Sequence, residues 1–527
     1  MGPWPGALAV LFCSHLGTTA TTGVTTTTTA ATAAASSGNI SLQLLRTVVN
    51  ASNLDYAVES RVYTAEAPDL LFVTHRASPP HASISVFDLA GGMAAMVAAS
   101  KAAVAGGGGS GGSGGSGVGV GGVGGGGGGG VGGDTHAMPP LPTLRARWVG
   151  QSVEGQDRRG DLLVVTALGN RASNGSKLLL FNASEAAAGS VPAGLLGGGG
   201  PFATLPLSFD GALHVKIYVQ QSPPPAATTA SATTTAATAP RSARVYAIIT
   251  AGLTSAAGAD RTLVAAVDIT DPARPAEVAR TSTACKCAEG VAVVPGGDGG
   301  GGGGGAIDVA FIGSYCSNEV ATLDLSQLPA AMPQLRSRSD PGYENMVSAV
   351  RNSSYQAARR RPLQQQTPPP PPPPPPPPRR LLYSASYASP GGLVIFDADA
   401  MGRQNGSVVE VGRAIALPSS RANRVHLSAD GRFALLALEK SPPAPGLPNG
   451  TTAAPAPETG GVAVVDIRDP ASPVLVAVAR VPDNASRAYC LATREASGPG
   501  GGLLVFLFGA TAEAMYTYLL SGYAYDA

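Results

Sequence analysis

Cysteines are the residues whose type and spacing point most directly to chemistry in this 527-residue chain. Cys285 and Cys287 stand two positions apart in TACKCAEG, and Cys316 follows in GSYCSNE. In an oxidising compartment Cys316 would pair with Cys285 or Cys287, closing a loop of about 30 residues worth roughly 3–4 kcal/mol. A zinc site with three thiolates is the alternative, but no fourth ligand is nearby. We therefore predict a disulfide, with Cys490 left as a buried thiol and Cys13 in the N-terminal leader.

Other residues that carry catalysis are sparse and lie in no known catalytic motif. The chain contains no G-x-S-x-G, H-E-x-x-H, P-loop lysine or EF-hand sequence. A metal pair formed by His75 and His81 is conceivable, although solvated loop histidines are far commoner. The sequence therefore predicts no catalytic residue, no metal and no cofactor. The other histidines are scattered at His15, His136, His214 and His426.

An aspartate recurs at the end of a short apolar run in five places. A ring of such carboxylates could bind calcium. An Asp at the end of a strand more often accepts backbone N–H bonds in a tight turn, and we expect that role here. The residues are Asp88, Asp268, Asp324, Asp397 and Asp466.

The stretch that positions these aspartates is an internal repeat. GVAVVDIRDPASPVLVAVAR, from Gly461 to Arg480, has two β-branched runs around an Asp-Pro turn, which predicts a β-hairpin. The segment from Thr262 to Arg280 matches it almost position for position, and Gly392 to Arg413 is a looser copy with a longer turn. Weaker copies of the first half lie at Ser83 to Ala90, Lys177 to Ser184 and Glu319 to Ser326.

Each copy follows another short apolar run, and the runs leading into and out of these pairs make four strands in each of seven units. Seven four-stranded units predict an all-β, seven-bladed β-propeller. Ser41 to Val49 would complete the last blade and leave no open sheet edge. Unit two is the weakest, because Val149 to Gly160 is a poor innermost strand. Leu503 to Leu520 is long enough for a transmembrane helix, but Glu513, with Gly509 and Thr511 in a gap that fits a turn, favours two strands.

The Gly-h-h-h-h-Asp-h-x-Asp-Pro-x-x-Pro pattern of Gly461 to Pro473 and Thr262 to Pro275 resembles the LVIVD repeat of surface-exposed and secreted β-propellers, where h is a hydrophobic residue. The resemblance is specific over those two copies, fair over Gly392 to Arg413 and weak elsewhere. It implies a propeller fold and an extracellular location, and it carries no catalytic set that could be transferred to this chain.

Composition limits the function and the extent of the folded part. With 35 Lys and Arg against 34 Asp and Glu, the chain has no basic surplus for nucleic acid.

Residues 1–38 are predicted to form an imperfect signal peptide and a Thr/Ala-rich leader, or else a misassigned start followed by a tail. Residues 39–527 form the propeller. Its low-complexity insertions lie near 106–133, 186–200, 222–240, 296–305, 356–379 and 441–460.

The insertions distinguish the two faces of the predicted disc. We label the strands of a blade A to D from the axis outwards. The A–B and C–D connections then lie on one face, here called the A–B face, and the B–C and D–A connections lie on the other, the B–C face. Five insertions fall on the A–B face and only that at 441–460 on the B–C face. Either the B–C face is kept clear for a partner, or repeat slippage inserted these tracts in loops that tolerate them.

Polar and aromatic residues of the B–C face form the candidate recognition site. Tyr and Arg are enriched at recognition surfaces, although both are also ordinary loop residues. The candidates are Tyr315, Asn318, Tyr343, Glu344, Tyr387, Arg421, Arg424, His426, Arg487 and Tyr489.

Glycosylation sequons favour the secretory pathway and an extracellular or cell-surface location. Eight of the 13 asparagines stand in Asn-x-Ser/Thr, where chance would give about two or three. Almost all fall in predicted loops, where an acceptor must be exposed. The eight are Asn39, Asn50, Asn174, Asn182, Asn352, Asn405, Asn449 and Asn484.

Two functions from different classes remain. The first is a secreted or wall-associated module that binds a protein or glycan, without nucleic acid and without a membrane span. The second is a lactonase- or phytase-like hydrolase, which would need several carboxylates or histidines where the A strands begin. Those starts contain only two carboxylates, Glu289 and Glu344, so binding is favoured.

Overall fold

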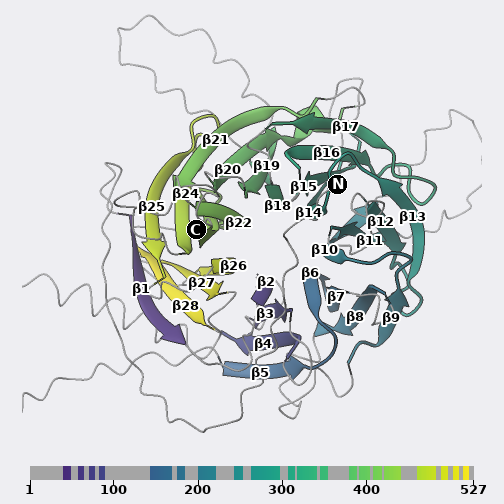
Figure 1. Cartoon of the computed structure of the whole chain (residues 1–527), viewed down its shortest axis with the longest axis horizontal. Coiled ribbons are helices and arrows are strands. Elements are labelled where there is room, and N and C mark those ends of the chain that lie inside the picture. The colour runs from purple at the N-terminus through teal and green to yellow at the C-terminus, as the bar shows by residue number, and fades with distance from the viewer. Residues whose placement is uncertain are drawn as a thin grey trace, which may run out of the picture.

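The computed structural model shows seven four-stranded sheets arranged in a ring around one axis (Figure 1). It describes residues 40–48, 57–63, 70–76, 82–89, 143–168, 175–183, 200–220, 243–252, 263–296, 307–314, 317–340, 345–353, 379–387, 391–403, 407–417, 420–440, 460–481, 488–495, 502–509 and 514–521.

The first four blades follow one another along the chain. Blade 1 contains β2 (Ala57–Tyr63), β3 (Leu70–His75), β4 (Ile84–Asp88) and β5 (Thr143–Trp148). Blade 2 contains β6 (Val153–Arg159), β7 (Leu162–Ala167), β8 (Lys177–Asn182) and β9 (Ala203–Pro206). Blade 3 contains β10 (Ala212–Gln220), β11 (Arg244–Ala251), β12 (Leu263–Asp268) and β13 (Ala276–Ser282). Blade 4 contains β14 (Ala288–Val294), β15 (Val309–Ser314), β16 (Glu319–Asp324) and β17 (Gln334–Ser339).

The last three blades close the ring. Blade 5 contains β18 (Asn345–Ser353), β19 (Arg379–Ser386), β20 (Gly391–Asp397) and β21 (Glu410–Leu417), with the short helix α3 (Ala398–Met401) between the last two strands. Blade 6 contains β22 (Ser420–Leu427), β23 (Phe433–Lys440), β24 (Gly461–Asp466) and β25 (Val474–Arg480). Blade 7 contains β26 (Ala488–Glu495), β27 (Leu503–Gly509), β28 (Met515–Ser521) and the N-terminal strand β1 (Ser41–Val48).

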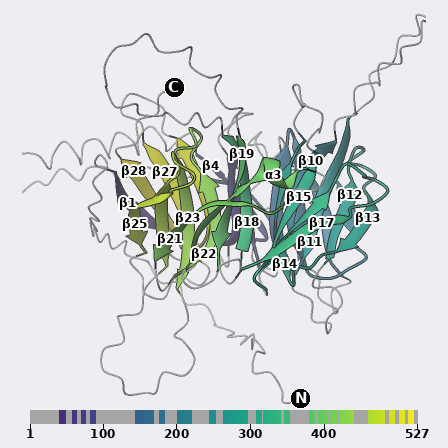
Figure 2. The ribbon, with the colours of Figure 1, turned by 90° about the horizontal axis from the view of Figure 1, so that it is seen from above.

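Within every blade the strands pair antiparallel, and in blades 1 to 6 they do so in chain order. Their first strands, β2, β6, β10, β14, β18 and β22, together with β26, lie nearest the axis (Figure 1). Seen from the side, the blades form one disc (Figure 2). The predicted seven-bladed architecture is confirmed. In the described part of the chain, no helix is long and apolar enough to cross a membrane.

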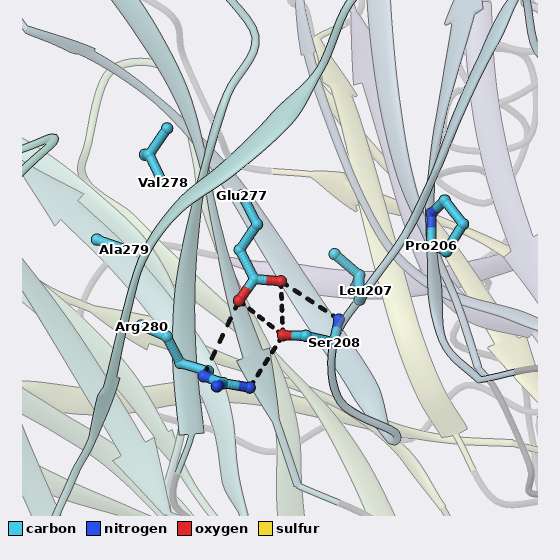
Figure 3. Close-up of a pocket in the computed structure, with 7 residues that line it drawn as sticks. All are labelled: Pro206, Leu207, Ser208, Glu277, Val278, Ala279 and Arg280. Atoms are coloured by element: carbon cyan, nitrogen blue, oxygen red, sulfur yellow. Dashed lines mark hydrogen bonds and ion pairs between the residues drawn. The ribbon is translucent and has the colours of Figure 1, made fainter.

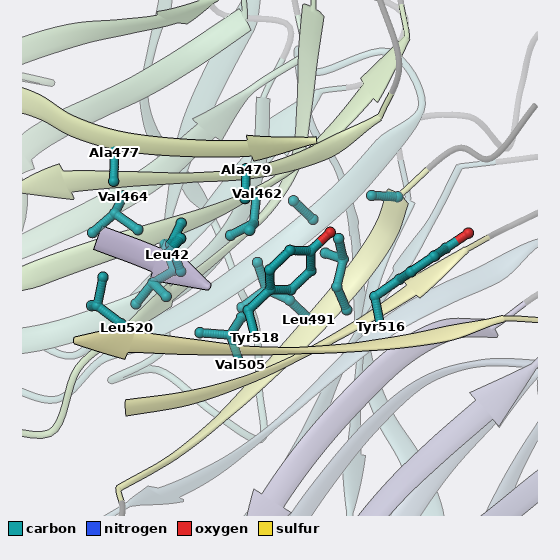
Figure 4. Packing of buried hydrophobic residues seen from close by; sticks show 14 of the residues in the cluster. Leu42, Val462, Val464, Ala477, Ala479, Leu491, Val505, Tyr516, Tyr518 and Leu520 are labelled. Carbon is teal, nitrogen blue, oxygen red and sulfur yellow. The ribbon is translucent and has the colours of Figure 1, made fainter. Parts of the chain in front are cut away.

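Ring closure joins the two ends of the described chain. β1 pairs with β28, with Leu42 opposite Leu520 and Val48 opposite Met515. Leu42 packs with Tyr518 and Val464 in the hydrophobic cluster between blades 6 and 7 (Figure 4). Because β27 and β28 are two strands, the transmembrane alternative for this stretch is wrong.

The hydrophobic core lies between neighbouring blades. The described parts of the middle strands are buried along their whole length in β3, β15, β24 and β27. Continuous burial arises because both faces of each sheet are covered by an adjacent blade, so these strands read as apolar runs without alternation.

The repeated motif forms the outer hairpin of a blade, and its aspartate stabilises the turn. In blade 6 this hairpin is β24 and β25, and Asp466 Oδ1 accepts the backbone N–H of Arg468 at 3.0 Å. Asp268 and Asp324 accept the N–H two residues later at 2.9 and 2.8 Å. Asp397 instead caps α3 through the N–H of Ala400. The turn role predicted for these aspartates is confirmed, while Asp88 forms an ion pair with Arg145.

Candidate functional site

Every inner strand has a β-bulge close to its beginning, on the B–C face. A bulge rotates the strand locally, and such irregularities commonly redirect side chains at functional sites. Here each shift in register lies within the first few residues of the strand. Polar side chains that would otherwise point into the space between two blades can therefore face the axis. The shifts lie between Ala57 and Glu59, Val153 and Gln156, Ala212 and Val215, Ala288 and Val291, Val347 and Ala349, Ala422 and Arg424, and Ala488 and Cys490.

Threonine hydroxyls fix three of these bulged segments to the neighbouring blade. Thr74, near the end of β3, donates to the carbonyl of Glu154 at 2.6 Å. Thr250, near the end of β11, donates to the carbonyl of Glu289 at the same distance. Thr166 of β7 makes the equivalent bond to the carbonyl of Leu213. The backbone that carries the site is therefore held by hydrogen bonds between blades.

Seven charged or titratable side chains from five inner strands form one connected group, which we call the axial cluster. It joins acids and bases from β2, β6, β10, β14 and β22 and is assembled from blades 1, 2, 3, 4 and 6. Its members are Glu59, Arg61, Asp157, His214, Lys216, Glu289 and Arg424.

Glu59 is the best-coordinated carboxylate of the axial cluster. Its Oε1 accepts Arg61 Nε at 2.8 Å, and its Oε2 accepts the backbone N–H of Gln156 at 2.9 Å. Burial by itself would raise the pKa of this carboxyl, but Arg61, His214 and Lys216 outweigh it, and the pKa lies well below its usual value. Glu59 is therefore a fixed negative charge.

His214 lies between two carboxylates and a guanidinium group. Its Nδ1 is 3.6 Å from Glu59 Oε2 and its Nε2 is 3.7 Å from Glu289 Oε1. Arg424 Nη2 is 3.0 Å from the same Nε2. Because a guanidinium can only donate, Nε2 accepts in its contact with Arg424. Burial by itself would raise the pKa of Glu289, but the positive charge of Arg424 contributes to holding it below its usual value.

Asp157 occupies the part of the cluster further along the strands. Its Oδ1 accepts Arg61 Nη1 at 3.2 Å and lies 3.7 Å from Lys216 Nζ, while its Oδ2 accepts the backbone N–H of Ile217 at 2.8 Å.

His426 is on the inner strand β22, and burial together with Arg61 lowers its pKa to about 3. His426 is therefore neutral at physiological pH.

Two tyrosine–arginine stacks lie where the inner strands begin. The guanidinium groups of Arg76 and Arg424 lie 6.0 and 5.4 Å from the centre of the Tyr489 ring. Arg421 lies 4.8 Å from the centre of the Tyr387 ring. Both tyrosines are buried, whereas Arg76 and Arg421 remain partly exposed. The rings thus orient guanidinium groups at the B–C face.

The carboxylate of Glu439 holds the tyrosine of the second stack in place. Glu439 Oε2 accepts the Tyr387 hydroxyl at 3.0 Å and Asn423 Nδ2 at 2.8 Å. This contact fixes the tyrosine ring and the start of β22 together. Arg421 therefore stacks on a tyrosine ring whose position is fixed by the hydrogen bond to Glu439.

The structure brings five predicted recognition residues to the axis and its surroundings: Tyr387, Arg421, Arg424, His426 and Tyr489. Asn318 is half-buried in the B–C turn of blade 4, and its carbonyl accepts the N–H of Asp340. The remaining candidates, Tyr315, Tyr343, Glu344 and Arg487, lie outside the described residues.

The sequence-based expectation of only two carboxylates near the axis was too low, because it did not include the A strands of blades 1 to 3. Charged or polar residues stand at spacings unusual for a buried strand in AVESRVY, VEGQDRR and ALHVKIYVQ. This pattern is the signal that was available in the sequence. The polar sequence that made unit two seem a poor inner strand is β6, which carries Glu154 and Asp157 toward the cluster. These acids are paired with bases, and among the described residues no group of His, Cys, Asp and Glu is arranged to hold a metal ion.

The cysteines lie in blade 4 and blade 7. Cys285 and Cys490 are free and buried, and burial raises the pKa of both thiols, that of Cys490 to about 12. Cys490 is thus the buried thiol that the sequence predicts. Cys287 is not among the free thiols and adopts φ of 51°. No disulfide is seen between two described cysteines, and Cys316 lies outside them, so its bridge stays a prediction with Cys287 as the remaining partner.

The structure describes only one of the two histidines that were considered as a metal pair. His75 is buried, and its Nε2 lies 3.1 Å from Ser85 Oγ inside blade 1, while His81 lies outside the described residues. Among the sequons, Asn182 is half-buried at the end of β8 and Asn352 lies in β18. The other six acceptor asparagines lie outside the described residues.

A shallow groove of about 520 Å³ lies at the perimeter, between blades 2 and 3 (Figure 3). Ser208 Oγ is 2.8 Å from both carboxylate oxygens of Glu277 and accepts Arg280 Nη1 at 2.9 Å. These side chains satisfy one another at an open surface. The groove is built from β9 and β13, the outermost strands of their blades, and therefore lies far from the axial cluster.

No protein-family model matches this chain, and no curated protein matches it in sequence. Among solved structures, Sqt1 of Saccharomyces cerevisiae is similar at 8% identity and a TM-score of 0.44, covering 91% of this chain and 99% of that one. The C-terminal WD40 domain of Sif2 is similar at 9% identity and 0.39, covering 91% and 98%. The periplasmic gluconolactonase of Pseudomonas aeruginosa is similar at 14% identity and 0.39, covering 66% and 78%.

Proposed function

We propose that this protein is a secreted or cell-surface β-propeller that binds a protein or glycan through its B–C face. The observation that carries the proposal is the pair of tyrosine–arginine stacks at the start of the inner strands. Arg76 is 22% exposed, and its guanidinium is held by Glu154 and by the Tyr489 ring. Arginines fixed in this way present hydrogen-bond donors at little further entropic cost, which is typical of recognition sites.

The extracellular part of the proposal is supported by the sequence. The eight sequons favour passage through the secretory pathway, an oxidising compartment in which the predicted bridge from Cys316 would form. Membership of the LVIVD-repeat family is proposed on the repeated Asp-Pro motif, and its two best copies coincide with the outer hairpins of blades 3 and 6. A mass decrease after enzymatic removal of N-glycans from protein secreted by eukaryotic cells would support this location.

Binding is tested with two arginines of blade 6 that lie on opposite faces. Arg421 stacks on Tyr387 at the B–C face, and Arg432 stacks at 4.9 Å on Phe433 in the A–B turn. Both are half-buried, so they form a matched pair. Wild type, Arg421→Ala and Arg432→Ala are applied to arrays of defined glycans and of extracellular proteins.

We expect Arg421→Ala to weaken binding to a wild-type ligand about 10-fold or more, as for a recognition hot spot worth roughly 1.4 kcal/mol. Arg432→Ala should bind as wild type does. Equal losses in the two variants, or a loss only in Arg432→Ala, would contradict binding through the B–C face.

A hydrolase with a metal on the axis is the second candidate, and His214 lies between Glu59 and Glu289 there, although these described side chains are not arranged to hold a metal ion. Arg61 and Arg424 approach the same carboxylates, which leaves less negative charge to attract a cation. Calorimetric titration with Ca²⁺, Mn²⁺ and Zn²⁺ separates the two functions. Tight binding of one metal that is lost in Glu289→Gln would favour the hydrolase.

A further inference from the structure

The two tyrosine–arginine stacks belong to one line of contacts across the B–C face. The line begins after β3 in blade 1 with Arg76, whose guanidinium lies 6.0 Å from the centre of the Tyr489 ring in blade 7. Arg424 of blade 6 lies 5.4 Å from the centre of the same ring, and its Nη1 donates to the carbonyl of Asn423 at 3.0 Å. The first stack is thus joined to the start of β22.

The line continues from blade 6 into blade 5. Asn423 Nδ2 and the Tyr387 hydroxyl both donate to Glu439 Oε2, at 2.8 and 3.0 Å. Arg421 then lies 4.8 Å from the centre of the Tyr387 ring. The partly exposed Arg76 and Arg421 are therefore the two ends of one arrangement held by side chains from four neighbouring blades. A partner meets both guanidinium groups in positions that are fixed before binding.

Carboxylates in this arrangement are more deeply buried than the arginines at its ends. The side chain of Glu154, which pairs with Arg76, is 1% exposed, against 22% for Arg76. Glu289, with Oε1 4.0 Å from Arg424 Nη1, is 5% exposed, and Glu439 is buried as well. A partner at the centre of the B–C face therefore meets the N–H groups of arginines rather than carboxylate oxygens.

The rim of the same face adds positive charge. An outer strand ends on the B–C face, and four of them carry an arginine within two residues of that end, each at least partly exposed. In the described part of this face, the partly exposed acids are Asp210, Glu319 and Asp340. The rim arginines are Arg147 in β5, Arg280 in β13, Arg338 in β17 and Arg480 in β25.

We propose that the B–C face binds an acidic segment of another protein, an extended stretch with several Asp or Glu side chains. This inference rests on the proposed binding function and narrows it to one class of partner. Arg76 and Arg421 each take a carboxylate through charge-assisted hydrogen bonds, which are stronger than neutral ones. The rim arginines attract the rest of the segment and speed its approach.

The aromatic side chains favour a peptide over a glycan. A sugar ring offers C–H groups that stack on the open apolar face of an aromatic ring. In the described part of the B–C face every such ring is at most 9% exposed, and two of them are covered by guanidinium groups. A carboxylate bound by arginine needs no open ring. The rings are Trp148, Phe209, Tyr387 and Tyr489.

The first test compares three probes on the intact wild-type protein. The acidic probe is a fluorescently labelled peptide in which Glu and Ser alternate. Its controls are the same peptide with Gln in place of Glu and a labelled oligogalacturonate with the same number of carboxylates. Fluorescence anisotropy measures the affinity of each probe at about 50 and 500 mM NaCl, because salt screens exposed charge pairs.

At low salt we expect the Glu peptide to bind at least about tenfold more tightly than either control, and to weaken at high salt. Equal binding of the Glu and Gln peptides, an oligogalacturonate bound as tightly as the Glu peptide, or no binding of the Glu peptide would overturn the proposal. If an array still yields an uncharged or glycan ligand that Arg421→Ala no longer binds, the binding function stands and only the acidic partner is refuted.

Two variants separate this site from general attraction by charge. Arg421→Gln and Arg432→Gln each remove one charge from a half-buried arginine stacked on an aromatic ring, on opposite faces. The first should weaken binding of the Glu peptide about fivefold or more, and the second by less than about twofold. Equal losses would overturn the proposal, and a loss only in Arg432→Gln would refute binding through the B–C face altogether. The comparison of probes on wild type decides if Arg421→Gln does not fold.

Discussion

Replacement of Glu59 by Gln tests whether the axial cluster stabilises the ring. The carboxylate accepts Arg61 Nε at 2.8 Å and the N–H of Gln156 at 2.9 Å. A buried charge that loses its only partner costs about 3–5 kcal/mol. Arg61 keeps Asp157 in this variant, and the new amide can still accept one bond, so we expect a loss of about 2–3 kcal/mol in the free energy of unfolding.

The loss should depend on pH in a defined direction. The pKa of Glu59 in the folded protein is below its usual value of 4.5, so its ionised form is favoured by folding. Its contribution is therefore complete above about pH 5 and is lost as the pH falls through the folded-state pKa. Urea denaturation of wild type and Glu59→Gln, followed by both fluorescence and circular dichroism from pH 7 down to pH 4, should show a constant difference that narrows only at the acidic end.

Glu277→Gln is the matched control. Glu277 pairs at 3.9 Å with Arg280, whose side chain is 46% exposed, at the perimeter groove. Such exposed pairs contribute little, so we expect a change within about 0.5 kcal/mol at pH 7. Equal losses for the two variants, or a Glu59→Gln effect that grows as the pH falls, would refute the reasoning.

Two further predictions concern ring closure and the blade 4 cysteines. Leu42→Ala should lower the free energy of unfolding by about 2–3 kcal/mol, because Leu42 is 9% exposed between β28 and blade 6, whereas Val474→Ala at a 54% exposed position should change it by less than about 0.5 kcal/mol. Urea denaturation measures both, and equal effects would contradict closure by β1. In secreted protein alkylated under denaturing, non-reducing conditions, we expect a bridge between Cys287 and Cys316, with Cys285 labelled. Mass mapping that finds all three labelled would disprove the bridge.

The seven-bladed architecture could be predicted from local patterns. A short apolar run, the Asp-Pro turn of Gly461 to Arg480 and a second run define a hairpin without any distant contact, because turn chemistry and β-branched residues act locally. Repetition then fixes the number of blades. The unpaired run at Ser41 and the incomplete last unit similarly indicated the closure between β1 and β28.

The functional candidates were only partly predictable. Loop position on the B–C face identified Tyr387, Arg421, Arg424 and Tyr489, because that face follows from strand order alone. It could not show that Tyr387 and Tyr489 are buried supports for arginines. Burial depends on which side chains of neighbouring blades cover a ring, and strand order does not specify this.

The sequence by itself determined the hairpins, the number of blades and which connections share a face, since these follow from periodicity and turn residues over a few positions. Only the tertiary structure decided that Glu59, Asp157, His214 and Glu289 meet at the axis. They come from four separate blades, and a bulge at the start of each inner strand sets the direction of their side chains. Charges so far apart in the chain interact only after the ring has closed, because closure brings these side chains within ion-pair distance of one another.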